Sequence, residues 1–156
     1  MKSRPTNQLS AIEKEVIAEI RALRALPGDG LHPTLVEDPA RLVHHLILAS
    51  HGNVQLRLRS IARELGVEMR TLERAFVGEY HMTMTKFQVE TRLAFSRWLL
   101  SIFPATKISV IAAILGYHLV QDFNRFFKKH MHQSPSEWGQ KERAIIARTG
   151  RATMDQ

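Results

Sequence analysis

The sequence predicts an all-α protein with two helix-turn-helix subdomains, joined by a long linker helix and preceded by an amphipathic N-terminal helix. A helical pattern ending in glycine occurs twice, as Ile61-Ala62-x-x-Leu65-Gly66 and, fifty residues later, as Ile111-Ala112-x-x-Leu115-Gly116. Each copy is followed by a second helical pattern, Leu72-x-Arg74-x-Phe76 and then Phe123-x-Arg125-x-Phe127. The offset between these second patterns is fifty-one, so the second copy has one extra residue in its turn. The sequence contains no long alternation of apolar and polar residues, which is the pattern that would indicate strands.

Length, charge and cysteine content limit the class of protein. A chain of 156 residues has room for one domain, or for two small ones that share a helix. Its 22 Lys and Arg against 15 Asp and Glu give a net charge of +7, which suits a polyanionic partner. Zero cysteines exclude disulfides and thiolate metal sites. Apolar stretches such as 46–49 are too short to cross a bilayer, so we expect a soluble cytoplasmic protein without a membrane partner.

Residues 9–26 predict one amphipathic helix near the N-terminus. Ser10 and Glu13 match a capping box, in which each side chain accepts a hydrogen bond from the other residue's backbone N–H. Apolar residues then recur at helical spacing: Ile12, Val16, Ile20, Leu23 and Leu26. Two interpretations stay open. The helix is either an arm that pairs two copies into a homodimer, or it packs against its own domain.

Helix start and stop signals divide the rest of the chain. Asp38 is a good N-cap and Pro39 suits the first helical turn, so a helix is expected to begin there. Ser134, Pro135 and Glu137 give the same kind of start to a closing helix. The expected parts are an arm over 1–38, a first subdomain over 39–82, a linker helix over 83–104, a second subdomain over 105–140 and a frayed basic tail over 141–156.

The second helix of each copy, about 69–79 and about 119–131, has an apolar and a polar face. The residues expected to face inward are Leu72, Ala75 and Phe76 in the first copy, and Phe123, Met131 and either Phe126 or Phe127 in the second. The side chains expected to be exposed are Arg70, Glu73, Arg74, Gln121, Asn124, Arg125 and Lys128.

These motifs together resemble the DNA-binding domain of the AraC/XylS family of bacterial transcription regulators, over about residues 39–140. The most specific stretch joins the second copy to Lys128-Lys129 and to Ser134-Pro135-Ser136-Glu137-Trp138, and Arg92-Leu93 matches the family's connecting helix. The resemblance implies two recognition helices, about 69–79 and 119–130, in a standalone activator or in a fragment of a longer regulator. This chain departs from the family where Gly usually follows each recognition helix, because His81 and His132 stand there. Glu68 and Leu119 also replace the usual capping residues.

The resemblance implies that the two recognition helices enter successive major-groove segments of double-stranded DNA, roughly 34 Å apart, over about 20 base pairs. Arg70 and Arg74 suit guanine, whereas Gln121 and Asn124 suit adenine. Arg125 either reads a base or binds a phosphate, and Glu73 either accepts from cytosine or repels non-cognate sites. Candidates for phosphate contacts are Arg57, Arg59, Lys107, Lys128 and Lys129, and the alternative for each of them is a solvated surface charge, which is the more common role of a single basic residue. The further expectations are an activator that contacts RNA polymerase at the nucleoid, with no cofactor.

Other functions have weaker sequence support. The eight histidines lack His-Glu-x-x-His spacing, and no phosphate-binding glycine loop or Ser-His-Asp order is present, so we expect neither a metal site nor an enzyme. A protein–protein module that modulates another transcription regulator stays open, since Leu119-Val120 is apolar and Glu68 and Glu73 are acidic. RNA binding is disfavoured, because the aromatic residues fall at core spacing rather than on a stacking surface.

Overall fold

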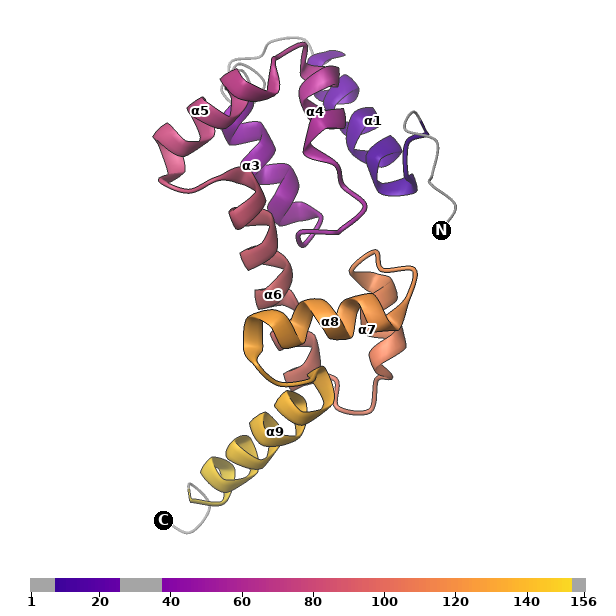
Figure 1. The fold of residues 1–156 in the computed structure, drawn as a ribbon, viewed down its shortest axis with the longest axis vertical. Coiled ribbons are helices and arrows are strands. Elements are labelled where there is room, and N and C mark those ends of the chain that lie inside the picture. The colour runs from indigo at the N-terminus through magenta and orange to yellow at the C-terminus, as the bar shows by residue number, and fades with distance from the viewer. Residues whose placement is uncertain (1–7, 26–37, 153–156) are drawn as a thin grey trace. The chain divides into compact units, whose positions relative to one another are not determined.

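The computed structural model describes residues 8–25 and 38–152, and every secondary-structure element in these ranges is a helix. The chain divides into two compact units, Met1–Thr91 and Arg92–Gln156, which are called unit 1 and unit 2. Helix α6 (Met84–Ile102) begins in unit 1 and continues into unit 2 (Figure 1). The predicted all-α fold class, with a repeated helix-turn-helix and a long linker helix, is confirmed.

Unit 1 contains α1 (Ala11–Ala25), α3 (Pro39–Ala49), α4 (Leu58–Leu65), α5 (Met69–Tyr80) and the first part of α6. Figure 1 shows α3 beside α5, and α4 beside α1. The centre of this unit is apolar and closed to solvent, because Leu42, Leu46, Ile47, Ile61 and Phe76 are all buried. Burial of these faces, rather than intrinsic helix propensity, is the main stabilising contribution for helices this short.

Helix α1 packs against its own unit. Val16, Ile17 and Ile20 are buried in the core that α3 and α4 also line. The side chain of Leu23 and the whole of Leu26, which were also expected to face inward, lie outside the described residues. Of the two interpretations of residues 9–26, the structure therefore favours packing within the domain.

Local capping signals were read correctly from the sequence at three helices. The Ser10 backbone N–H donates to Glu13 Oε2 at 2.7 Å, and the Glu13 N–H donates to Ser10 Oγ at 3.2 Å. Asp38 Oδ1 accepts from the backbone N–H of residue 40 at 3.1 Å, with Pro39 in the first turn. Ser134 and Glu137 repeat the capping box, with hydrogen bonds of 3.1 and 3.2 Å. Each pair satisfies N–H groups that a helix start leaves without partners.

The two glycine turns have the same hydrogen-bond geometry. After α4, the Val67 N–H donates to the Ala62 carbonyl at 3.0 Å, with Gly66 at φ 69°. After α7 (Ile108–Ile114), the Tyr117 N–H donates to the Ala112 carbonyl at 2.9 Å, with the equivalent glycine at φ 89°. A left-handed residue in this position is the geometry that glycine adopts at least cost. The extra residue of the second copy lies directly after this turn, at 118.

Unit 2 contains the rest of α6, then α7, α8 (Val120–Met131) and α9 (Pro135–Ala152). Its core holds Ile111, Phe123 and Phe127, while Phe126 is only half-buried, which decides the alternative that the sequence left open. The expectation of a frayed tail from 141 was wrong for most of that segment. Helix α9 continues through residues that favour helix, and the Thr149 hydroxyl donates to the Ile145 carbonyl at 3.0 Å.

No helix in the described ranges combines the length and the apolar character needed to cross a membrane.

Candidate nucleic-acid interface

The exposed face of α5 carries two arginines one helical turn apart. Arg70 lies in the first turn and Arg74 four residues later, both exposed, and neither makes an ion pair with a described residue. Glu73, which was expected to be exposed, is half-buried, whereas Ala75, which was expected to be buried, is exposed. The buried face is centred between Leu72 and Phe76, and at 100° per residue Glu73 and Ala75 lie about 80° to either side of that centre. Helical spacing alone therefore does not decide which of the two is covered by the rest of unit 1.

Helix α8 presents a more polar and more basic face. Gln121, Asn124, Arg125, Lys128 and Lys129 are all exposed, as predicted for the first four of them. Arg125 also pairs with Asp122 on its own helix, with Nη2 at 3.1 Å from Oδ1. An exposed pair of this kind contributes little to stability, so it leaves the guanidinium available for another acceptor.

The two helices correspond position by position at the offset of fifty-one. Arg70 corresponds to Gln121, Glu73 to Asn124, and Arg74 to Arg125. The buried Leu72 and Phe76 of α5 correspond in the same way to the buried Phe123 and Phe127 of α8. Each helix therefore carries polar side chains at the same three positions, of which only Glu73 is half-buried.

The ends of both helices are unusual in the same way. Glu68 before α5 and Leu119 before α8 make no side-chain capping hydrogen bond. His81 and His132 end the two helices in the left-handed conformation, at φ 57° and 59°. A non-glycine residue pays a steric cost there, which is why the family pattern favours glycine. Uncapped N-termini leave N–H groups pointing outward, which is favourable for an anion such as a DNA phosphate.

A buried arginine connects α8 to the linker helix within unit 2. Arg92 on α6 is only 7% exposed, and its Nη1 donates to the Tyr117 hydroxyl at 3.3 Å. The guanidinium also lies over the ring of Phe126, 5.0 Å from its centroid. Burial raises the pKa of Tyr117, which keeps its hydroxyl protonated and able to take part in this contact. Arg92 therefore helps to fix the orientation of α8, a role that the sequence analysis did not assign to it.

Arg57, one of the candidates for phosphate binding, pairs with a carboxylate of its own unit. Its Nε donates to Glu13 Oε1 at 2.7 Å and its Nη2 to Oε2 at 3.0 Å, while Glu13 is 1% exposed. Burial alone would raise the pKa of Glu13, but hydrogen bonds from the Arg57 side chain and from the backbone N–H groups of Ser10 and Arg57 lower it to about 2. No sequence pattern indicated this pair, because its members are far apart along the chain.

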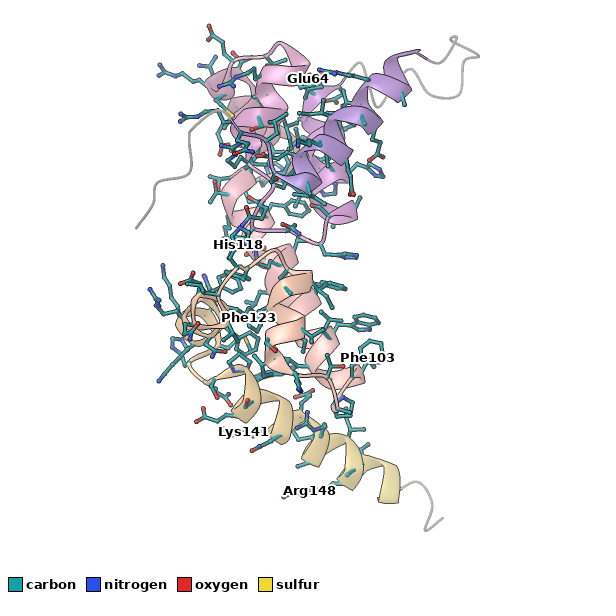
Figure 2. The ribbon with its side chains drawn as sticks, turned by 90° about the vertical axis from the view of Figure 1, so that its right-hand side faces the viewer. Glu64, Phe103, His118, Phe123, Lys141 and Arg148 are labelled. Carbon is teal, nitrogen blue, oxygen red and sulfur yellow. The ribbon has the colours of Figure 1, made fainter. Side chains whose placement is uncertain are left out.

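The expectation that the aromatic residues occupy core positions was wrong for part of α6. Trp98 and Phe103 are both exposed, and Figure 2 shows Phe103 at the surface while Phe123 lies among the helices of unit 2. Conversely, His44 is half-buried and stacked on Tyr80 and Phe87, with ring centroids 4.1 and 4.4 Å apart. Burial, followed by the neighbouring His45, lowers the pKa of His44, so this histidine serves as an aromatic core residue.

Comparison with known proteins identifies this arrangement. The sequence model of a family described as a helix-turn-helix domain, of the AraC type, matches residues 61–141, which is more than half of the chain. The chain belongs to the AraC-type helix-turn-helix family. Members of this family are DNA-binding transcription regulators, so the domain that carries α5 and α8 is a DNA-binding one. No curated protein matches the chain significantly.

Solved structures agree with the AraC-type fold. The chain is similar to the C-terminal domain of AraT, a response regulator from Geobacillus stearothermophilus, with 25% identity and a TM-score of 0.60 over 66% of this chain and 84% of that one. It has the fold of the C-terminal domain of the two-component response regulator yesN from Fusobacterium nucleatum subsp. nucleatum ATCC 25586, at 21% identity and a TM-score of 0.57 over 63% and 94%. It also has the fold of a DNA-binding transcriptional dual regulator from Escherichia coli K-12, at 22% identity and a TM-score of 0.54 over 73% and 96%.

Proposed function

We propose that this AraC-type protein is a sequence-specific transcription regulator that reads two adjacent major-groove segments, one with α5 and one with α8. The observation that carries the proposal is the position-by-position match of the two exposed faces. Polar side chains are exposed at two pairs of equivalent positions, Arg70 with Gln121 and Arg74 with Arg125, in the part of the helix that reaches base edges in helix-turn-helix proteins. At the third pair, Asn124 is exposed and Glu73 is half-buried. Two such faces on one chain suit an asymmetric site of about 20 base pairs.

Side-chain chemistry assigns a role to each exposed position. Arg70 and Arg74 can each donate two hydrogen bonds to guanine, whereas Gln121 and Asn124 can each bridge the donor and acceptor of adenine. Arg125, already balanced by Asp122, can turn either to a base or to a phosphate.

The remaining positions bind backbone or exclude wrong sites. Lys128 and Lys129, in the last turn of α8, bind phosphates and add affinity without sequence preference. Glu73, half-buried at the edge of the α5 face, accepts from cytosine or repels phosphate at non-cognate sites.

The domain division fits this function, and we propose it as predicted: a helical arm over 1–38, subdomains over 39–82 and 105–140, a linker helix over 83–104 and a basic segment over 141–156. We further propose that the bound protein activates transcription through RNA polymerase in the cytoplasm, at the nucleoid, without enzymatic activity. A promoter reporter that carries the selected site would test activation, because a repressor would lower its output. A homodimer in which this helix acts as a free arm, over residues 9–26, is not proposed, because Val16, Ile17 and Ile20 are buried.

Selection of bound sequences from a random duplex pool tests the reading roles. We expect a defined site for the wild type. The change Arg74→Ala should relax base preference in one half of that site, whereas Lys129→Ala should weaken binding to all sequences alike. Lys14→Ala, an exposed lysine on α1, is the matched control and should leave both unchanged. If the arginine and lysine changes gave the same footprint, the assignment of roles would be wrong.

Salt dependence tests the phosphate contacts separately. The logarithm of the binding constant should fall with the logarithm of salt concentration, with a slope of about −0.9 for each phosphate neutralised. Removing both Lys128 and Lys129 should reduce the magnitude of that slope by about 2. If the binding constant of the wild type did not change with salt concentration, DNA binding through phosphate contacts of basic side chains would be contradicted.

A further inference from the structure

An exposed aromatic surface on unit 2 has no role in the proposed reading of DNA. Phe95, Trp98 and Ile102 follow one another at helical spacing along α6, and Phe103 comes next; we call these four residues the aromatic patch. The rings of Phe95 and Trp98 are stacked with centroids 5.7 Å apart, and Phe103 lies edge-on to Trp98 at 5.6 Å. Trp98, Ile102 and Phe103 are 49%, 55% and 45% exposed. Contiguous exposed apolar groups of this kind mark interaction surfaces.

The surroundings of the aromatic patch are basic. Arg97, next to Trp98, is exposed, and Lys107 lines a small cavity of about 180 Å³ together with Phe103 and Arg143. Neither Arg97 nor Lys107 makes an ion pair with a described residue. Unit 2 as a whole has ten Lys and Arg against four Asp and Glu. The patch therefore fits a surface that is both apolar and acidic, and it repels another basic patch.

The same chain carries a surface of that kind on unit 1. A groove of about 130 Å³ between α1 and α3 is lined by Ile12, Val16 and Leu46, with Glu15 and Glu19 at its edge; we call it the acidic groove. Glu15 makes no ion pair with a described residue, and Glu19 lies 3.9 Å from His45 Nε2 across an exposed contact. The groove has about the volume that holds one benzene ring in a protein cavity, roughly 150 Å³. Because the groove is open to solvent, it can receive the edge of one aromatic ring rather than enclose a whole side chain.

We propose that the aromatic patch of one copy docks into the acidic groove of a second copy, head to tail. A ring from the patch would enter the groove, with Arg97 placed against Glu15 or Glu19. The alternative pairings, patch with patch or groove with groove, bring like charges together, which is unfavourable. The two contacting surfaces are different, so the contact is heterologous and the pair as a whole keeps one free patch and one free groove.

The proposed contact is small, and its small size limits the conditions under which two copies would associate. One ring in a small groove gives a weak contact in solution, far below the area of a stable dimer. Two copies bound at adjacent DNA sites lie close together, so the effective concentration of one copy for the other is much higher than in solution. The contact would then appear as cooperative binding to DNA. The docking itself does not depend on DNA, and only this use of it rests on the proposed function.

Two complementary variants test the docking. Glu15→Lys with Glu19→Lys removes the acidic groove and leaves the aromatic patch, and Arg97→Glu with Trp98→Ser does the reverse. At low salt and about 500 µM protein, where a contact of millimolar strength is detectable, sedimentation should show association of the wild type. Each variant alone should stay monomeric, and their equimolar mixture should form a one-to-one dimer, because one intact patch meets one intact groove.

Controls separate docking from folding and from DNA binding. Glu90→Lys, another exposed charge reversal, should leave wild-type association unchanged, and circular dichroism checks that each variant is folded. If the variant with Arg97→Glu and Trp98→Ser did not fold, a variant with Phe103→Ser and Lys107→Glu would take its place. An equimolar mixture that stays monomeric overturns the proposal. Dimerisation of the Glu15→Lys, Glu19→Lys variant alone, which lacks the acidic groove, overturns it as well. Both variants retain α5 and α8, so failure of docking leaves duplex binding to be judged separately.

Discussion

Unit 1 contains twelve Lys and Arg against eleven Asp and Glu, whereas unit 2 contains ten against four. Nearly all of the chain's net charge of +7 therefore belongs to unit 2. Among the described residues, unit 2 also has eight of the ten exposed large apolar side chains. The two units therefore differ in their surfaces. Unit 2 carries most of the net positive charge, which would attract a polyanion, and most of the exposed large apolar side chains.

The cores differ in the opposite sense. Fourteen buried apolar residues form the core of unit 1, against seven in unit 2. Unit 1 gains its larger core from α1 and α3, and it adds the ion pair between the buried Glu13 and the exposed Arg57. In unit 2, the guanidinium of Arg92 lies over the rings of Tyr117 and Phe126. The comparison teaches that a helix-turn-helix needs outside support, and that the two units obtain it by different chemistry.

The largest expected effect is the loss of the buried carboxylate of unit 1. Glu13→Gln should lower the free energy of unfolding of unit 1 by about 3 kcal/mol, because it leaves Arg57 and two backbone N–H groups with a poorer acceptor. Hydrogen exchange measured segment by segment should show the loss over α1 and α4. Glu15→Gln, an exposed carboxylate on the same helix, should change stability by less than about 0.5 kcal/mol. Equal effects of the two changes would mean that the pair does not support unit 1.

The pH dependence of the same residue sharpens the test. Because the pKa of Glu13 falls from 4.5 to about 2 on folding, its contribution is complete above pH 4.5 and is lost as the pH falls toward 2. The shift corresponds to roughly 3 kcal/mol as an upper value. Acid titration of unit 1 stability should therefore be steeper in the wild type than in Glu13→Gln.

The next effect falls on unit 2. Arg92→Ala should destabilise it by about 2 kcal/mol, because the variant loses a desolvated cation–π contact and its packing against Tyr117 and Phe126. Both tryptophans, Trp98 and Trp138, belong to unit 2, so denaturant unfolding followed by tryptophan fluorescence reports on this unit. Arg97→Ala, exposed on the same helix, is the control. A variant as stable as this control would refute the role of Arg92 in holding α8.

The smallest effect concerns the left-handed histidines, where the units should behave alike. His81→Gly and His132→Gly should each stabilise the protein by about 0.5 kcal/mol, since the steric cost of the left-handed residue slightly exceeds the added entropy of the unfolded chain. His130→Gly, within α8, should instead destabilise by a similar amount. Thermal unfolding of the three variants would check the signs. Opposite signs at 81 and 132 would show that the two helix ends are not equivalent.

Local signals along the chain determined much of this protein. The glycine turns at Gly66 and Gly116, the capping boxes at Ser10 and Ser134, and the Asp38 cap act over a few residues, so neighbouring side chains suffice to predict them. The polar positions of α8 followed from helical spacing in the same way. The repeat of these signals at a constant offset was enough to predict the all-α fold and the two equivalent exposed helices.

The tertiary structure alone decided which residues from distant parts of the chain contact one another. The sequence could not pair Glu13 with Arg57, because burial and not proximity along the chain sets that contact. Nor could helical spacing place Trp98 on the surface and His44 in an aromatic stack, since an apolar position becomes core only where another helix covers it. Packing of α1 against its own unit is the same case: the amphipathic pattern predicted a face to bury, and only the fold determined what would cover it.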